Sequence, residues 1–259
     1  MTAPTIALTD LGGAPELPLL VLGPSLGTST ILWETAAPAL RAHHRLLAWD
    51  LPGHGASPVA TDPFSVADLA DALAASVDGP FVYAGVSLGG ATGLELLLRH
   101  PGRVRAAAIV ASGAQLGEPA AWHERAATVR AESTSSIIVA SAQRWFAPGS
   151  MAAHPDLTGR LLHALQDADD ESYARCCEAL ADYDVRSRLG GIVPPVLALW
   201  GRDDAVAPEA KAVEIAEGVA QGRAAVIEGA AHLPPAEQPE ATAAALLAFF
   251  DRGTEGARP

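Results

Sequence analysis

The sequence predicts an α/β fold with a mostly parallel central sheet, helices on both faces and an inserted helical lid. Short apolar segments of strand length alternate with segments of helical periodicity, which is typical of such a sheet. The chain has 259 residues, 49% of them hydrophobic, which is enough for one large domain. Because the alternation is interrupted in the second half, we expect a core domain from residues 1–113 and 191–259 and a lid from residues 114–190.

Seven segments have the composition of strands. Residues 18–23, Pro-Leu-Leu-Val-Leu-Gly, are apolar throughout, as expected of a central strand that is buried on both faces. Residues 80–86 are also mainly apolar and begin at a turn-forming Gly-Pro pair. The remaining predicted strands are residues 5–8, 45–49, 104–111, 195–200 and 224–227.

Helical periodicity separates most of these strands. Ser65 and Asp68 have the spacing of a capping box at the start of one helix. Another helix stops before Pro101, and Pro119 suits the first position of a third, where its missing N–H is not needed. The predicted helices are residues 30–41, 66–77, 88–100, 119–141, 156–166, 172–183, 209–217 and 236–251, and residues 253–259 are predicted to be a frayed tail.

Charge and cysteine content bear on partners and location. The formal net charge is −13, so we expect neither nucleic acid nor an anionic membrane as a partner. We find no signal-peptide pattern and no apolar run long enough to span a membrane. The two cysteines, Cys176 and Cys177, are adjacent, which favours unpaired thiols on a helix. Together these features predict a cytoplasmic protein.

The strand that ends at Val86 is followed by a motif with chemical meaning. Residues 85–89 read Gly-Val-Ser-Leu-Gly, which is a G-x-S-x-G sequence between a strand and a helix. A sharp turn there strains the backbone of Ser87 and holds its hydroxyl at the sheet edge, while the glycines let neighbouring backbone approach. A glycine-rich turn with an incidental serine is the alternative. The strand–turn–helix context favours Ser87 as a nucleophile.

Two later loops contain the residues that would activate such a serine. The carboxyl ends of parallel strands meet at one edge of a sheet, where active residues gather. Asp203 and Asp204 follow the predicted strand at residues 195–200, and His232 follows the last predicted strand. A histidine accepts the serine proton, and a carboxylate behind it fixes the tautomer and stabilises the imidazolium. The order Ser87, aspartate, His232 predicts a catalytic triad, with one aspartate in the site and the other capping the turn.

Acyl transfer also needs backbone N–H donors for the negative oxygen of its intermediate. One donor is expected from the residue after the nucleophile, Leu88, and the other from the loop after residues 18–23, at Leu26 or its neighbour. We therefore predict an oxyanion hole at Leu26 and Leu88. His54 and Asp50 are interpreted as structural residues that hold the neighbouring loop.

Several segments carry a resemblance to known proteins. G-x-S-x-G and the Asp-x-x-Gly-x-Gly that begins at Asp50 are widespread, whereas Ser-Leu-Gly-Thr, Arg-Trp-Phe and Cys-Cys-Glu-Ala-Leu-Ala-Asp are more specific. On these segments the chain resembles the α/β-hydrolases over nearly its full length, and within them the 3-oxoadipate enol-lactonases. The family spacing Gly-x-x-Asp selects Asp204 as the acid of the triad. The matching segments are residues 25–28, 50–57, 85–90, 144–146, 176–182, 201–204 and 232–240.

The resemblance implies hydrolysis of 3-oxoadipate enol-lactone to 3-oxoadipate, in the β-ketoadipate pathway of aromatic catabolism. The substrate is then a small carboxylated lactone with water as the second substrate, and no metal or organic cofactor is implied. Arg144 is expected to pair with the substrate carboxylate, and Ser25 and Trp145 are assigned to the substrate-binding site. Simple packing of the lid is the alternative for Trp145, and a solvated helix face is the alternative for Arg144.

Two other functions remain open from the sequence. One is a different enzyme with the same triad, such as a general carboxylesterase, a perhydrolase or an acyltransferase. The other is a ligand-binding receptor that retains a hydrolase pocket. The sequence predicts no particular oligomeric state.

Overall fold

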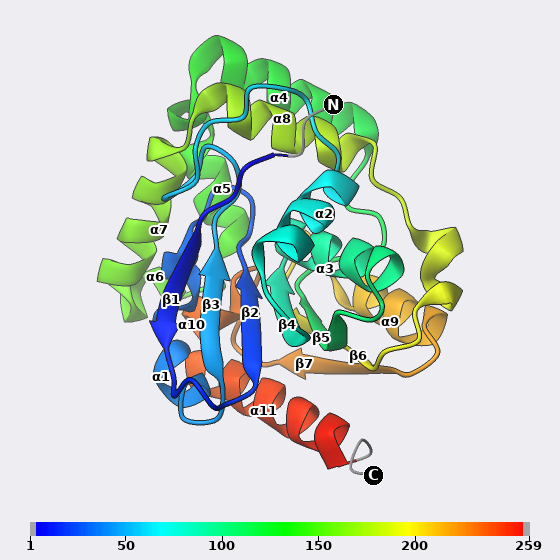
Figure 1. Ribbon diagram of the computed structural model, residues 1–259. Helices are drawn as coiled ribbons and strands as arrows, with labels where there is room; N and C mark the ends of the chain where they lie inside the picture. The colour runs from blue at the N-terminus through cyan, green and yellow to red at the C-terminus, as the bar shows by residue number, and fades with distance from the viewer. Residues whose placement is uncertain (1–3, 256–259) are drawn as a thin grey trace.

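The structure is a computed structural model and describes residues 4–255 of the chain. Its centre is a seven-stranded sheet with the strand order β1-β3-β2-β4-β5-β6-β7 (Figure 1). β1 runs antiparallel to β3 and the other neighbouring pairs are parallel, which confirms the predicted sheet. The strands are β1 (Leu8–Gly12), β2 (Leu19–Gly23), β3 (Arg45–Trp49), β4 (Phe81–Val86), β5 (Val104–Val110), β6 (Val196–Gly201) and β7 (Gly222–Ile227).

The prediction of a first strand at residues 5–8 is wrong, because β1 begins only at Leu8. It pairs with β3 from Leu8 opposite Trp49 to Gly12 opposite Leu46. β1 lies at the edge of the sheet and is only partly buried, so it lacks the continuous apolar run that marks a central strand. The other six predicted strands are confirmed to within two residues at each end.

Helices cover both faces of the sheet, as predicted. α2 and α3 pack together on one face, and α1 and α11 pack together on the other (Figure 1). α9 packs beside β6 and β7. The helices are α1 (Ala37–Leu40), α2 (Val66–Ser76), α3 (Leu88–Arg99), α4 (Pro119–Glu132), α5 (Ile138–Trp145), α6 (Ser150–Ala153), α7 (Pro155–Asp167), α8 (Asp170–Ala181), α9 (Glu209–Gly218), α10 (Pro234–Glu237) and α11 (Pro239–Glu255), with 3-10 turns η1 (Thr30–Trp33), η2 (Thr134–Ile137) and η3 (Arg186–Gly191).

The predicted helix at residues 119–141 is broken in the structure. α4 ends before Ser133, whose φ of 66° lies in the left-handed region and cannot continue a right-handed helix. The Ser133 hydroxyl accepts a hydrogen bond from the Ser135 N–H and so caps the next turn, η2. The chain therefore changes direction here before α5 begins.

Prolines explain two further breaks. The prediction of one helix at residues 30–41 is wrong because Pro38, at the second position of α1, has no N–H with which to continue a helix from η1. The prediction at residues 236–251 is wrong at Gln238, since the residue before Pro239 is disfavoured in the helical conformation. α11 extends to Glu255, so the start of the predicted tail is helical, and the rest of that tail lies outside the described residues.

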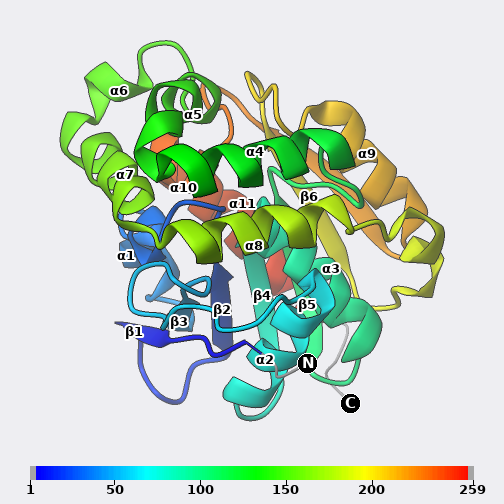
Figure 2. The same cartoon turned by 90° about the horizontal axis from the view of Figure 1, so that it is seen from above.

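The carboxyl ends of the parallel strands meet at one edge of the sheet. Ser25 follows β2, Ser87 follows β4, Asp204 follows β6 and His232 follows β7. Helices α4 to α8 lie over this edge, and Figure 2 shows α4 and α8 side by side across it. In the part of the chain that the structure describes, no strand occurs between β5 and β6.

Two smaller predictions concern the cysteines and the membrane. Cys176 and Cys177 are unpaired and buried in α8, as expected. Burial raises the pKa of both thiols, that of Cys177 to about 12, so neither is a reactive thiolate. Among residues 4–255 there is no helix with the length and apolar character needed to cross a bilayer.

Candidate active site

Ser87 occupies the turn between β4 and α3. Its backbone has φ = 54° and ψ = −114°, a strained conformation for a residue with a side chain. The Ser87 N–H donates to Val110 O at 2.9 Å, and the Ser112 hydroxyl donates to Ser87 O at 2.7 Å. These two bonds to the end of β5 and its loop hold the turn in place, so the strain is supported by the neighbouring strand.

The glycines of the G-x-S-x-G sequence allow this turn to pack. A Cβ atom at Gly85 would lie 2.5 Å from the carbonyl carbon of Gly89, and one at Gly89 would lie 2.5 Å from Pro24 O. The Gly89 N–H instead donates to Pro24 O at 2.9 Å. The turn that carries Ser87 is thereby joined to the loop that follows β2.

Asp204 and His232 form a buried hydrogen-bonded pair. Nδ1 of His232 lies 3.0 Å from Oδ2 of Asp204. Oδ1 of Asp204 accepts the N–H groups of Val206 and Ala207 at 2.7 and 3.0 Å. Burial by itself would raise the pKa of Asp204, but His232 and the two N–H donors outweigh it and lower that pKa. Asp204 is therefore ionised at neutral pH and holds the imidazole by one nitrogen.

Asp203 is exposed and does not reach this pair. From the sequence, one aspartate is expected to face the site and the other to cap the turn. In the structure Asp204 does both, because one of its oxygens points to His232 and the other accepts the N–H groups of the turn. The prediction that the second aspartate caps the turn is wrong for this reason.

The two predicted oxyanion donors lie in loops that touch each other. The loop after β2 is a tight turn in which Ser25 N–H donates to Thr28 Oγ1 at 3.0 Å and the Thr28 hydroxyl donates to Ser25 O at 2.8 Å. Within residues 4–255, neither the N–H of Leu26 nor that of Leu88 has a hydrogen-bond acceptor in the protein. Both donors are thus free for an oxygen atom of a ligand.

His54 and Asp50 form hydrogen bonds to the backbone of the segment that follows β2 and contains Leu26. Nδ1 of His54 lies 2.9 Å from Pro52 O, so this nitrogen carries the proton and Nε2 accepts the Gly27 N–H at 3.3 Å. Burial lowers the pKa of His54 to about 4, which keeps Nε2 an acceptor at neutral pH. The Asp50 carboxylate accepts the N–H of Thr30 at 2.8 Å. These bonds agree with the structural interpretation of both residues.

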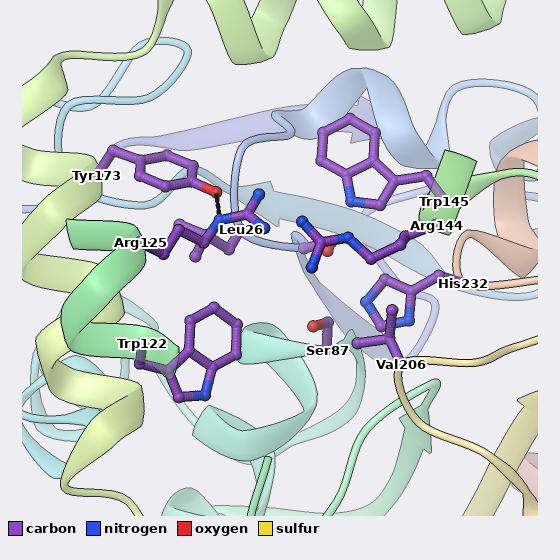
Figure 3. A pocket seen from close by; sticks show the side chains of 10 residues that line it. Leu26, Ser87, Trp122, Arg125, Arg144, Trp145, Tyr173, Val206 and His232 are labelled. Atoms are coloured by element: carbon purple, nitrogen blue, oxygen red, sulfur yellow. Dashed lines mark hydrogen bonds between the residues drawn. The ribbon is translucent and has the colours of Figure 1, made fainter. Parts of the chain in front are cut away.

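A pocket of about 50 Å³ lies above Ser87, between the carboxyl edge and the helices that cover it. Figure 3 shows the side chains that line it, with His232 next to Ser87. The residues predicted for substrate binding, Ser25, Arg144 and Trp145, all line this pocket. The complete lining is Ser25, Leu26, Ser87, Trp122, Arg125, Arg144, Trp145, Tyr173, Val206 and His232.

Comparison with known proteins places the chain in a family. Residues 18–239 match the family model described as the alpha/beta hydrolase fold. The chain is 33% identical to 3-oxoadipate enol-lactonase 2 of Acinetobacter baylyi, over 97% of this chain and 96% of the relative. It is also 30% identical to a pimeloyl-[acyl-carrier protein] methyl ester esterase of Neisseria meningitidis, over 88% of this chain and 90% of the relative. The crystal structure of the enol-lactonase from Burkholderia xenovorans LB400 superposes with a TM-score of 0.90 and 29% identity, over 95% of this chain and 96% of that one.

The chain belongs to the α/β-hydrolase family. The predicted fold class and the resemblance to enol-lactonases are thereby confirmed, and the protein is a hydrolase that acts on ester bonds. The family also gives Ser87, Asp204 and His232 a common context, because they follow three parallel strands at the edge where α/β folds place their active sites.

The pocket of this hydrolase contains a second arginine, which is not among the substrate-binding residues predicted from the sequence. Arg125 on α4 lines the pocket with Arg144 on α5, and Figure 3 shows the two guanidinium groups next to each other. Nε of Arg125 donates to the Tyr173 hydroxyl at 2.8 Å, and Nη2 donates to Ser141 Oγ at 2.9 Å. Partial burial and the charge of Arg125 lower the pKa of Arg144. Trp122 and Arg125 are three residues apart and share one face of a helix, but the sequence gives no signal that this face lines the pocket.

Proposed function

We propose that the protein hydrolyses a small carboxylated enol-lactone, 3-oxoadipate enol-lactone, to 3-oxoadipate. The observation that carries this proposal is the charge of the pocket. Among residues 4–255, two arginines and no acidic side chain line the pocket, although the whole chain has a net charge of −13. A locally positive pocket in an acidic protein favours an anionic substrate.

Ser87 is the nucleophile in the proposed reaction. Its oxygen attacks the lactone carbonyl while Nε2 of His232 accepts its proton, and Asp204 keeps the proton of Nδ1 in place. The ring opens as the C–O bond to the enol oxygen breaks, and His232 returns the proton to that oxygen. The acyl group stays on Ser87 until His232 activates a water molecule, which releases the acid. The enol then tautomerises to the ketone, which makes the hydrolysis hard to reverse.

Leu26 and Leu88 stabilise the negative charge that forms on the carbonyl oxygen in both half-reactions. Their N–H groups come from two loops that the Gly89 N–H to Pro24 O bond joins, so their spacing is set before substrate binds. His54 supports the same loop through Gly27. Removal of one such donor typically costs about 10²–10³ in kcat.

Arg144 and Arg125 are proposed to recognise the carboxymethyl group of the lactone. The guanidinium of Arg125 already donates to Tyr173 and Ser141. In Arg144, only Nε donates to an acceptor among the described residues, which is Ala140 O at 3.1 Å. The terminal nitrogens of Arg144 therefore remain for a bidentate contact with carboxylate. The substrate brings one carboxylate and the product has two, which agrees with a pocket that contains two cations.

We further propose that residues 114–190 act as the lid of the site. Five of its helical side chains line the pocket, namely Trp122, Arg125, Arg144, Trp145 and Tyr173. The lid would then supply the contacts that select a substrate, while the core supplies the triad and the oxyanion hole.

A substrate panel tests this proposal. The panel contains freshly generated enol-lactone, its neutral analogue without the carboxylate, p-nitrophenyl acetate, and a pimeloyl methyl ester carried on acyl-carrier protein. We expect the highest kcat/KM with the carboxylated lactone, because the small pocket and its arginines fit a compact anion better than a long acyl chain. A higher kcat/KM with the pimeloyl ester would favour the esterase function that one relative has. No turnover of any substrate, with Ser87 inert to fluorophosphonate, would favour a receptor.

A further inference from the structure

Glu237 is a buried carboxylate five residues after His232, with 2% of its surface exposed. It is the last residue of α10, a short helix that begins at Pro234 and Pro235. The Glu237 N–H donates to Leu233 O at 3.1 Å. This single turn brings the carboxylate back to the loop from which the chain has just come.

One oxygen of Glu237 holds the backbone around His232. Oε1 accepts the N–H groups of Ala231 at 2.9 Å and Leu233 at 3.2 Å, the residues on either side of the histidine. The N–H of His232 itself donates to Trp145 O at 3.1 Å. The N–H groups of residues 231–233 are thus all hydrogen-bonded. These bonds restrict movement of the backbone that carries the imidazole.

The other oxygen holds the segment that follows α5. Oε2 accepts the Ala147 N–H at 2.6 Å and the Ser150 hydroxyl at 2.8 Å. This segment directly follows Arg144 and Trp145, which line the pocket. One carboxylate therefore connects the loop of the proposed general base to the end of the helix that carries proposed substrate contacts.

The four contacts require a carboxylate at this position. Four donors point at Glu237, and an ionised carboxylate offers about four acceptor sites. Burial raises the pKa of Glu237 although the four donors act in the opposite direction, and within the described residues no ion pair includes it. Glutamine has one acceptor oxygen and would turn its NH₂ group toward two donors. A buried charge without a cation is costly, so packing alone does not explain its presence.

We propose that Glu237 is a positioning residue, which aligns His232 and the Arg144–Trp145 end of α5 through a single carboxylate. This inference rests on the proposed function, because it takes His232 as the general base. Loss of the carboxylate should lower kcat through His232 and raise KM through the lid contacts, in enzyme that is still folded. A residue that only stabilised the fold would leave both constants of the folded enzyme unchanged.

The test compares Glu237→Gln, Glu237→Asp and Ser150→Ala with the wild type, on the enol-lactone and on p-nitrophenyl acetate. Misplacement of a catalytic group by about 1 Å can cost about 10²-fold, so we expect Glu237→Gln to lower kcat roughly 10- to 100-fold with both substrates. Glu237→Asp keeps the charge and should recover part of the loss. Ser150→Ala removes one lid-side donor and should raise KM for the carboxylated lactone more than for the neutral ester.

Glu240→Gln is the matched control, because Glu240 is exposed, lies three residues later and carries the same charge. We expect it to stay within about twofold of the wild type, as surface substitutions usually do. Wild-type kcat and KM in Glu237→Gln, with only the unfolding temperature lowered, would overturn the inference. If that variant does not fold, wild-type constants in both Glu237→Asp and Ser150→Ala would overturn it instead.

Ser87→Ala is measured in the same series to separate this inference from the function on which it rests. An inactive Ser87→Ala together with an impaired Glu237→Gln supports both. An inactive Ser87→Ala together with a fully active Glu237→Gln overturns only the role of Glu237. An active Ser87→Ala overturns the proposed function and removes the basis of this inference with it.

Discussion

Replacement of Arg144 by alanine should weaken the hydrolysis of carboxylated lactones selectively. Arg144 lines the pocket, and its terminal nitrogens bond to no protein acceptor within the described residues. A charge-assisted contact to carboxylate is worth about 1.5–3 kcal/mol, which corresponds to a roughly 10- to 150-fold loss in kcat/KM. Arg144→Lys should recover only part of this, since a point charge cannot reproduce the bidentate fork of a guanidinium.

The assay is the ratio of kcat/KM for a lactone with the carboxylate to that for its neutral analogue. We expect Arg144→Ala to lower this ratio and to leave the neutral substrate unaffected, because its transition state never used the arginine. Arg160→Ala is a suitable control, since Arg160 lies on α7, outside the pocket, and forms an exposed ion pair with Glu34. An unchanged ratio in Arg144→Ala would refute the role of Arg144 and move the carboxylate to Arg125.

Three further changes test the core of the site. Asp204→Asn should lower turnover by roughly 10⁴ whereas Asp203→Asn should have little effect, and turnover numbers in the opposite order would show that the wrong aspartate pairs with His232. Gly89→Ala should abolish activity or folding, because a Cβ atom would lie 2.5 Å from Pro24 O, and an active, stable variant by kinetics and thermal unfolding would contradict this. Burial lowers the pKa of His54 to about 4, below its unfolded value near 6.5, so the folded state binds fewer protons between these values and loses stability as pH falls through this range, by up to about 3 kcal/mol. Chemical unfolding at pH 7 and pH 4.5 should show a larger loss in the wild type than in a His54→Gln variant, which retains the loss due to buried His44, and equal losses in both would contradict the prediction.

The parts of the site that depend on short sequence segments could be predicted from the sequence. The position of Ser87 is determined by its sequence neighbours, because a residue with a Cβ atom at position 85 or 89 would clash with the backbone of the turn. Asp204 and His232 could be located because strand order places the ends of β6 and β7 at the same edge as the end of β4. Ser87 and His232 needed only a local motif and the rule for parallel sheets, whereas the choice of Asp204 over Asp203 also needed the resemblance to the α/β-hydrolases.

The rest of the site depends on contacts between distant segments. Arg125 reaches the pocket because α4 packs against α8. Its guanidinium is oriented by Tyr173 on α8 and by Ser141 on α5. No spacing along the chain distinguishes Arg125 from the other arginines of this region. Glu237 is likewise defined by donors from residues that are up to 90 positions away. The break at Ser133 follows from a local backbone conformation that serine adopts rarely, so periodicity alone predicted a continuous helix.

The most direct test of the central claim is to trap the acyl-enzyme on Ser87. The wild-type protein is mixed with freshly generated enol-lactone, quenched in acid within the first turnovers and examined by mass spectrometry after digestion. We expect an added mass equal to that of the lactone on the peptide that contains Ser87, and none in Ser87→Ala, whose turnover should fall by about 10⁶. Turnover of the lactone by Ser87→Ala at more than about a hundredth of the wild-type rate, or an adduct on another residue, would contradict the assignment of Ser87 as the nucleophile.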